Sequence, residues 1–519
     1  MNESRIVKTQ KNAISAVAQT VLNSVLSFLA RIIFVSILSV DYLGINGLFT
    51  NILSVLSLAD LGMQTAMMYS LYKPIADKDV NKIRDLVCYF RRIYFVIALV
   101  IFIAGIAIIP FLKFIINLDN EIPHLIAYYI LALLNIVISY LFVYRTTLVF
   151  ADQKNYILNK YVMVFKVINF AAQTVILFSF KNYFFYLVVA LIVSFLGNVY
   201  QNKVTLELYP FLKEKGRQLS EADKSKIIID IKALFLYRIS GTIQSNTDNI
   251  LISIFVGTVF VGYYSNYLII ITALISVLTL IFNSVKASIG NIIASDDTNL
   301  KQKEFYFWVL ELVNFWMVAF CSISCICLFP DFINIFLGKE YKLSLGITIA
   351  IVMNFYTNYS RQVIWTFRET TGLFHETRFI TTVTAVLNII FSLVAGYYFG
   401  MLGILVATVL ARMIYAWWKE PIILFHNYFK KSAKQYYITY IRRFVVLVIT
   451  AILTFGLGEI FEMYNIYIRF GWKIVLCCIV PNLTFGIYFK KTDELKYILD
   501  KIVIPMVRKV KSVVEGRIH

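Results

Sequence analysis

The sequence predicts an all-α protein that crosses a membrane many times. Its 519 residues are 60% hydrophobic and only 15% charged, with a mean hydropathy of +0.75. A soluble fold of this length has too little interior to bury so much apolar surface. The apolar residues also fall into runs of about 20 or more, the length that a helix needs to cross the hydrocarbon core. The polar N-terminal segment leads into a full-length run, so we expect no cleaved signal peptide.

About fourteen such runs follow one another along the chain. Their centres lie near residues 26, 57, 98, 135, 168, 194, 243, 275, 315, 357, 388, 413, 450 and 477. Lys and Arg gather in alternate connections, and the positive-inside rule then places both termini in the cytoplasm. The net charge of +19 therefore reflects topology and contact with lipid headgroups, and nucleic-acid binding is the weaker interpretation.

The connections divide the chain into parts. Those on the outer side are short, as at 181–183, whereas the longest inner connection runs from Lys203 to Lys226. Ser220 and Asp223 have the spacing of a capping box, which predicts the start of a helix. We expect a six-helix lobe at 1–206, a cytoplasmic linker at 207–226, a second six-helix lobe at 227–430, two further helices at 431–491 and a basic amphipathic cytoplasmic tail at 492–519.

Two of the predicted helices carry polar side chains along one face. The first carries Thr20, Ser24, Ser27 and Arg31, and the second carries Arg238, Thr242, Ser245 and Asn249, with Asp248 beside them. Spacings of three and four residues place each set on one helical stripe. An ion that faced lipid tails would cost several kcal/mol. We therefore expect both stripes to line a hydrophilic cavity.

The same two helices are predicted to be equivalent members of an internal repeat. Aligning Gly44 with Gly262 sets Ser27 against Ser245, and the polar pattern of the two stripes then coincides. Transporters are often built from such repeats of helices, with the binding site at their interface. A chance resemblance between two membrane helices is the alternative.

Ionisable residues inside the predicted spans are the candidate functional residues. Arg31, Asp248 and Arg412 lie near the middle of their spans, whereas Arg238 and Arg361 lie nearer the cytoplasm, where a long side chain can also reach the headgroups. A purely structural ion pair between Arg31 and Asp248 is the alternative for those two residues.

Two further ionisable residues complete this set. Lys286 lies near the inner end of its helix, where contact with headgroups is the simpler explanation, and Asp60 lies within SLADLGMQTA. Asp60 and Asp248 are candidates for ion coupling, although Asp60 could equally bond to another helix. Because the cations of this set outnumber the anions, the cavity should prefer an anion. Guanidinium groups suit a diphosphate, since they offer forked donors and keep their charge.

Nothing in the sequence indicates an enzyme. The six cysteines lie inside apolar runs, and the four histidines show no spacing typical of metal ligands. A phosphate-binding glycine loop of the Walker type is missing from the sequence. We expect no catalytic residues, no metal and no cofactor.

Three diffuse segments carry a family resemblance: SLADLGMQTA, NILISIFVGTVFVGYYSNY and YYFGMLGILVATVLAR. Together with the layout of about fourteen helices, they make nearly the whole chain similar to one branch of the multidrug/oligosaccharidyl-lipid/polysaccharide exporter superfamily. The chain resembles the Wzx-type flippases of that branch, which serve O-antigen and capsule repeat units.

This resemblance implies two six-helix lobes in a V shape, two extra C-terminal helices, and alternating access in the cytoplasmic membrane of a bacterium. The implied substrate is an undecaprenyl-diphosphate-linked oligosaccharide, flipped from the inner to the outer leaflet and driven by membrane potential or an ion gradient. Membrane lipids, a polysaccharide polymerase and other assembly proteins are the implied partners.

Three alternatives remain open at this point. A flippase for lipid II, the peptidoglycan precursor, is the nearest of them. A multidrug exporter is disfavoured by the sign of the expected cavity, and a membrane polysaccharide polymerase is disfavoured because the sequence offers no long outer loop for a catalytic surface.

Overall fold

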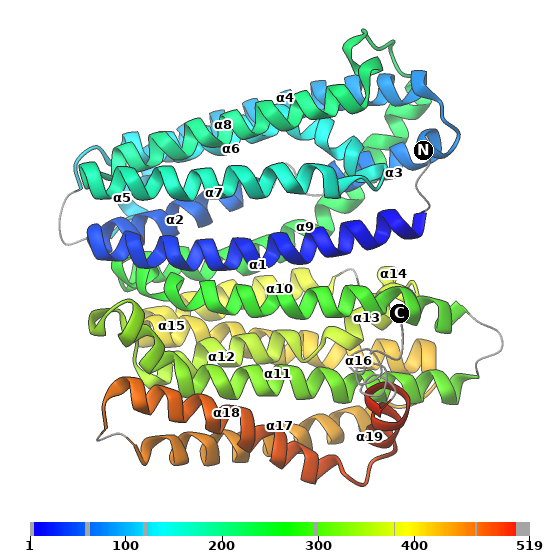
Figure 1. Ribbon diagram of the computed structural model, residues 1–519. Coiled ribbons are helices and arrows are strands. Elements are labelled where there is room, and N and C mark those ends of the chain that lie inside the picture. The colour runs from blue at the N-terminus through cyan, green and yellow to red at the C-terminus, as the bar shows by residue number, and fades with distance from the viewer. Residues whose placement is uncertain are drawn as a thin grey trace, which may run out of the picture. The chain divides into compact units, whose positions relative to one another are not determined.

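The computed structural model consists of α-helices joined by short connections (Figure 1). It describes residues 5–57, 63–117, 122–294, 299–377, 379–461 and 464–504, and within them it leaves undescribed the side chains of 232–245, 283–292 and a few other positions. Ten helical stretches of this part of the chain are long and apolar enough to cross a membrane. The prediction of an all-α, multi-pass membrane protein is therefore confirmed.

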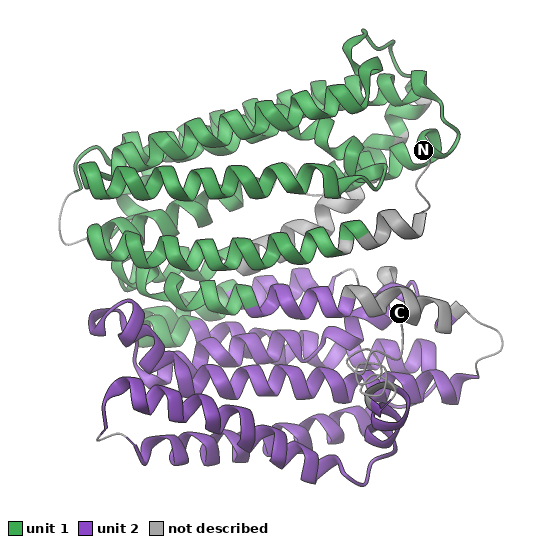
Figure 2. Ribbon diagram, viewed as in Figure 1, with its two compact units in different colours: residues 1–273, 389–404 green, residues 274–388, 405–519 purple. Residues whose placement is uncertain are grey.

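The chain divides into two compact units, coloured separately in Figure 2. Unit 1 contains residues 1–273 and 389–404, and unit 2 contains residues 274–388 and 405–519. Two long helices contribute residues to both units: α10 (Thr258–Ala294) and α15 (Ile380–Ala411). The lobe boundaries that the sequence suggested, at 206 and 227, stay a prediction.

Unit 1 contains a bundle of long antiparallel helices. In chain order its helices are α1 (Arg5–Ile37), α2 (Val40–Leu56), α3 (Met63–Ala76), α4 (Val80–Ile108), α5 (Leu112–Ile115), α6 (Leu125–Ala151), α7 (Asn155–Phe180), α8 (Tyr183–Leu208) and α9 (Glu221–Phe255). Helix α6 packs against α4 and α8, and α7 packs against α1 and α8. Helix α9 packs against α2 and α3. Tyrosines and aliphatic side chains, among them Tyr94, Tyr129 and Leu133, fill the interior.

Unit 2 is organised around α11 (Leu300–Phe336), which packs against α12, α17 and α18. The remaining helices of this unit are α12 (Leu345–Tyr359), α13 (Gln362–Thr370), α14 (Phe374–Thr377), α16 (Trp417–Leu424), α17 (Lys434–Glu459), α18 (Ile466–Phe489) and α19 (Asp493–Ile498). A π-helical turn (Arg412–Ala416) joins α15 to α16, and a second one (Phe425–Phe429) follows α16. Such turns interrupt the regular hydrogen-bond ladder and are frequent at functional sites.

Most of the predicted span centres fall within described helices, whereas the centre near 57 lies at the end of α2, next to residues outside the described part. One continuous stretch, Ile380–Phe429, holds the two predicted centres at 388 and 413, and it is folded back at Gly400, whose φ of +57° breaks the helix. The centre near 357 falls in α12, which ends at Tyr359 before the short α13 begins. The centre at 243 falls in α9, whose polar residues lower its mean hydropathy. Interrupted or polar helices of this kind are missed by a count based on length and hydropathy.

The structure confirms several of the predicted connections. Helix α7 ends at Phe180 and α8 begins at Tyr183, so the turn between them is as short as predicted. Ser220 is the N-cap of α9, and its hydroxyl accepts a hydrogen bond from the Asp223 amide at 3.2 Å. The tail beyond residue 504 lies outside the described residues.

The two glycines that aligned as repeat equivalents contact each other in unit 1. A Cβ built on Gly44 of α2 would lie 2.2 Å from the Thr258 carbonyl oxygen, and one built on Gly262 of α10 would lie 2.9 Å from the Gly44 nitrogen. Only glycine allows these backbones to approach so closely. That the two glycines belong to equivalent helices of an internal repeat stays a prediction.

Candidate functional site

The predicted polar stripe of the first helix lies on α1 of unit 1. Thr20, Ser24, Ser27 and Arg31 are all half-buried, and α1 packs against α7 and α2 along this length. Val17, Val21, Val25 and Leu29 of the same helix are exposed instead. The helix therefore has an apolar face suited to lipid and a polar face directed toward its neighbours, as the spacing of its residues predicts.

A cavity of about 270 Å³ lies against the end of this stripe. We refer to it as the α1–α7 cavity, because most of its polar lining comes from these two helices. Its polar lining residues are Ser27 and Arg31 of α1, Asn46 of α2, Lys166, Asn169 and Gln173 of α7, and Tyr186 of α8. Leu26, Ala30, Phe34, Leu43, Phe170 and Ile269 supply the apolar part of the wall.

Hydrogen bonds hold several of these polar groups in place. Arg31 Nη1 donates to Ser265 Oγ of α10 at 3.0 Å. Asn169 Nδ2 donates to Gln173 Oε1 at 3.0 Å, while Asn169 Oδ1 is buried with no hydrogen-bond partner in the described part of the chain. Tyr183 Oη donates to Asn46 Oδ1 at 3.2 Å. The cavity thus has a fixed set of donors and at least one unsatisfied acceptor.

The charge of the α1–α7 cavity is positive. Its described lining contains two cations, Arg31 and Lys166, and no carboxylate. The hydrogen-bond partner of Arg31 is a neutral hydroxyl, which leaves its charge uncompensated by that contact. A guanidinium and an ammonium group in a partly desolvated space favour an anion, and they bind phosphate oxygens well.

Arg361 lies in unit 2 and takes part in an ionic network. Its Nη1 is 2.8 Å from Glu420 Oε2, and the same carboxylate is 3.7 Å from Arg368 and accepts a hydrogen bond from Trp365 Nε1. Both members of the Arg361–Glu420 pair are about 4% exposed. This placement is what a structural ion pair requires. The proposed role of Arg361 in a substrate cavity stays a prediction.

Arg412 lies in the same unit, at the start of the first π-helical turn. It is buried, and its Nη1 donates to Thr357 Oγ1 at 3.0 Å and to the Asn354 carbonyl at 3.1 Å. Both contacts are to α12. In these two contacts the guanidinium donates to neutral oxygens.

The second polar stripe lies on α9, and only its last part can be described. Asp248 and Asn249 are buried in unit 1, and Asn249 Oδ1 has no hydrogen-bond partner within the described residues. The side chains of Arg238, Thr242, Ser245 and Lys286, and all of Asp60, lie outside the described residues. That the stripes of α1 and α9 face one another therefore stays a prediction, as do the roles of these residues.

Several buried charged residues were not among the residues predicted from the sequence. The predicted excess of buried cations over buried anions therefore left out several buried carboxylates. Glu311 and Glu420 are each about 4% exposed in unit 2, and Asp331 is 2% exposed. Glu311 pairs with Arg443 at 3.8 Å, and Asp331 pairs with Lys473 at 3.1 Å. These carboxylates stand within apolar runs such as WVLELVNF and WWKEPII, so the signal was visible in the sequence. In unit 1, Lys166 of α7 was also not predicted as a site residue, because it does not belong to either of the two polar stripes.

Comparisons with known proteins connect the chain with transporters by fold. No family model and no curated protein matches its sequence. Among solved structures, it is similar to the lipid II flippase MurJ in an inward closed conformation, with a TM-score of 0.68, 13% identity, and coverage of 92% of this chain and 99% of that one.

Two MATE transporters are also similar. A mutant of the Vibrio cholerae MATE transporter VcmN gives a TM-score of 0.54 at 12% identity, covering 79% of this chain and 96% of that one. An inward-facing MATE family transporter of the MOP superfamily gives 0.52 at 15% identity, covering 78% and 95%. The chain therefore shares the fold of these polytopic transporters.

Proposed function

We propose that the protein is a flippase that moves undecaprenyl-diphosphate-linked oligosaccharide repeat units from the inner to the outer leaflet. The α1–α7 cavity carries this proposal. It combines two cations with amide and hydroxyl groups and has no carboxylate in its described lining. A diphosphate requires the cations, and sugars require the amides and hydroxyls. The similarity of fold to a lipid II flippase and to MATE transporters supports a transporter of this general kind.

The physical task of such a protein is to move ionised and strongly hydrated groups past hydrocarbon. Burying such groups without partners would cost many kcal/mol, so a polar path through the protein removes the main barrier. In this proposal the lipid tail stays in the membrane, while Arg31 and Lys166 bind the diphosphate. The two predicted lobes, 1–206 and 227–430, open in turn to each side.

The membrane potential can supply the driving force. A headgroup that carries about two negative charges gains roughly 4–5 kcal/mol when it moves outward across an inside-negative potential of about 100 mV. This scheme assigns both termini to the cytoplasm of a bacterium and requires no catalytic residue. Ion coupling through Asp60 or Asp248 would be an addition to it, and collapse of ion gradients with no effect on flipping would remove that addition.

A lipid II flippase is the second candidate. The fold similarity to MurJ extends over 92% of this chain, which is more than either of the MATE transporters described above covers. The same cavity chemistry suits both substrates, because each presents a diphosphate and sugars. A multidrug exporter that takes cations fits less well, because the described lining of the α1–α7 cavity is cationic.

Reconstitution into vesicles tests the proposal. A fluorescent polyprenyl-diphosphate disaccharide is placed in both leaflets, and a membrane-impermeant reductant then reports how fast the protected fraction becomes accessible. We expect flipping by the wild-type chain, at least a tenfold slower rate for Arg31→Ala, and an intermediate rate for Arg31→Lys, which keeps the charge but loses the forked geometry.

Arg442→Ala is the matched control, because this arginine is exposed on α17. Its rate should stay within twofold of the wild type. Wild-type flipping by Arg31→Ala would contradict the proposal. Movement of lipid II in place of the oligosaccharide lipid would select the second candidate.

A further inference from the structure

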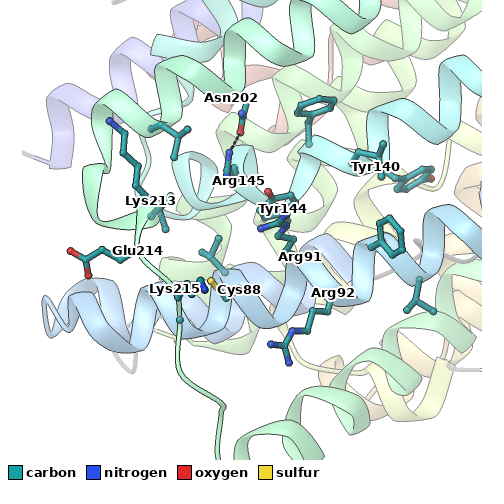
Figure 3. A pocket seen from close by; sticks show the side chains of 18 residues that line it. Cys88, Arg91, Arg92, Tyr140, Tyr144, Arg145, Asn202, Lys213, Glu214 and Lys215 are labelled. Atoms are coloured by element: carbon teal, nitrogen blue, oxygen red, sulfur yellow. Dashed lines mark hydrogen bonds between the residues drawn. The ribbon is translucent and has the colours of Figure 1, made fainter.

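A second positively charged cavity lies in unit 1, at the end of the bundle where the linker after α8 crosses α4. Its volume is about 1060 Å³, and its walls come from α4, α6, α8 and the linker (Figure 3). We call it the α4–α6–α8 groove. It shares no lining residue with the α1–α7 cavity.

Five cations line this groove, and they come from three different segments. Arg91 and Arg92 belong to α4, Arg145 belongs to α6, and Lys213 and Lys215 belong to the linker (Figure 3). Arg145 Nη1 donates to Asn202 Oδ1 of α8 at 2.6 Å, so this guanidinium is oriented by a neutral amide. The segments that supply these cations are separated along the chain by more than fifty residues, and the fold brings these residues to the walls of one groove.

The single carboxylate in the described lining is already engaged by another group. Glu214 accepts a hydrogen bond from Arg84 Nη1 at 2.5 Å, and Arg84 is not part of the groove. Arg91, Arg92, Lys213 and Lys215 have no ion-pair partner within the described part of the chain. The groove therefore has an excess of positive charge that the protein itself does not balance.

The linker is fixed in place by contacts with α4. The Arg217 amide donates to Asp85 Oδ1 at 2.8 Å, and Lys82 forms an ion pair with Asp223. Gly216 lies so close to Cys88 that an added Cβ would be 2.8 Å from its Cβ. These contacts hold Lys213 and Lys215 beside the arginines of α4 and α6. The cationic cluster is therefore part of the folded unit.

The other walls of the groove are apolar and exposed. Phe95 is 61% exposed, Val96 57% and Leu141 38%, and the exposed apolar surface of α4 continues through Leu99 and Val100. Arg91 and Arg92 directly precede the apolar run of α4, so they mark the boundary between headgroups and hydrocarbon. A soluble phosphate ion would make no favourable contact with these apolar walls. An amphipathic lipid would contact the cations with its headgroup and the apolar walls with its acyl chains.

From this juxtaposition we infer that the α4–α6–α8 groove binds an anionic phospholipid with two phosphates, of the diphosphatidylglycerol class. Basic pockets between membrane helices on the cytoplasmic side are suited to such headgroups. Five cations exceed what one phosphate can balance, and the volume lies at the upper end of the range for ligand sites. The acyl chains then lie along Phe95, Val96 and Leu141. This site is separate from the proposed path of the transported lipid.

Native mass spectrometry of the full chain in detergent tests the inference. Diphosphatidylglycerol, phosphatidylglycerol and zwitterionic phosphatidylethanolamine are titrated in turn. We expect the tightest binding for diphosphatidylglycerol, and at least tenfold weaker binding of it to Arg91→Gln/Arg92→Gln. Lys160→Gln/Lys301→Gln removes two exposed lysines outside the groove and should stay within twofold of the wild type. Lys213→Gln/Lys215→Gln in the exposed linker provides a second test if the arginine variant does not fold.

Three results would overturn the inference. The first is unchanged diphosphatidylglycerol binding in both folded groove variants. The second is full displacement of the lipid by inorganic diphosphate at an equal concentration, which would assign the site to a soluble anion. The third is preferential displacement by a polyprenyl diphosphate, which would assign the groove to the transported lipid. None of these results depends on whether the protein flips its proposed substrate.

Discussion

The cations of the unit 2 ion pairs and those of the α1–α7 cavity in unit 1 have different partners. In unit 2, Arg361 is 2.8 Å from Glu420, and Lys473 is 3.1 Å from Asp331. In the α1–α7 cavity of unit 1, Arg31 donates to a serine hydroxyl, and the described lining contains no carboxylate. We expect a cation that pairs with a carboxylate to stabilise the fold, and one whose described contact is a neutral hydroxyl to be available to a ligand. Mutations should therefore separate the ion pairs of unit 2 from the α1–α7 cavity by whether they change stability or transport.

The largest expected effect is on stability, in unit 2. Glu420→Gln removes the carboxylate that Arg361 and Arg368 share, and it leaves two cations buried without their anion. Breaking a buried ion pair in this way costs about 3–5 kcal/mol. We expect a clear fall in the melting temperature of the purified protein, measured by intrinsic fluorescence in detergent.

Two further variants serve as comparisons for the loss of stability in Glu420→Gln. Glu221→Gln breaks an exposed ion pair with Lys224, and such surface pairs contribute about 0–1 kcal/mol. Arg31→Gln should likewise leave the melting temperature nearly unchanged. If Arg31→Gln lowered it as much as Glu420→Gln does, the distinction between the two units would fail.

A second effect on stability is expected where α2 meets α10. Gly44→Ala places a methyl group 2.2 Å from the Thr258 carbonyl oxygen, and this backbone atom cannot move aside without shifting a helix. Overpacking of this kind costs about 1–3 kcal/mol. Thermal unfolding of the purified variant measures it.

Gly456→Ala on α17 is the matched control, because nothing lies within 4 Å of its added Cβ. Replacing a helical glycine by alanine in open space stabilises a helix by up to about 1 kcal/mol. Equal melting temperatures for the two variants would show that the α2–α10 contact is looser than the backbone geometry indicates.

A smaller effect is expected around Arg412. Thr357→Val removes one oxygen that accepts a hydrogen bond from its guanidinium, and the Asn354 carbonyl remains. We expect a loss of about 1 kcal/mol. Thr366→Val, whose hydroxyl donates to the Gln362 carbonyl of its own helix, should cost less. Equal losses would mean that the Thr357 hydroxyl contributes no more to Arg412 than an ordinary helix contact does.

The fold was predictable from the sequence because membrane helices have a strong signal. Runs of apolar residues located the helices, and the capping residue Ser220 located the start of α9. The polar stripe of α1 was also readable, because three- and four-residue spacings define a helical face. Each of these features is local in the sequence.

The candidate site was only partly predictable, because its members come from different helices. Ser27 and Arg31 line the α1–α7 cavity, whereas the predicted cavity between their stripe and the stripe of α9 stays a prediction. Lys166 and Gln173 of α7 could not be assigned to the cavity without the packing of α7 on α1. The pairing of Glu420 with Arg361 likewise joins positions 59 residues apart. Charges in an apolar run show that a partner exists, and only the fold shows which one it is.

The most direct test of the central claim measures binding to the α1–α7 cavity without requiring transport. A short-chain polyprenyl-diphosphate disaccharide is titrated into the purified protein, and its dissociation constant is compared for the wild type, Arg31→Gln and Arg442→Gln. We predict at least a tenfold weaker affinity for Arg31→Gln at an unchanged melting temperature, and a change within twofold for Arg442→Gln. Wild-type affinity in a folded Arg31→Gln protein would contradict the claim that this cavity binds the diphosphate.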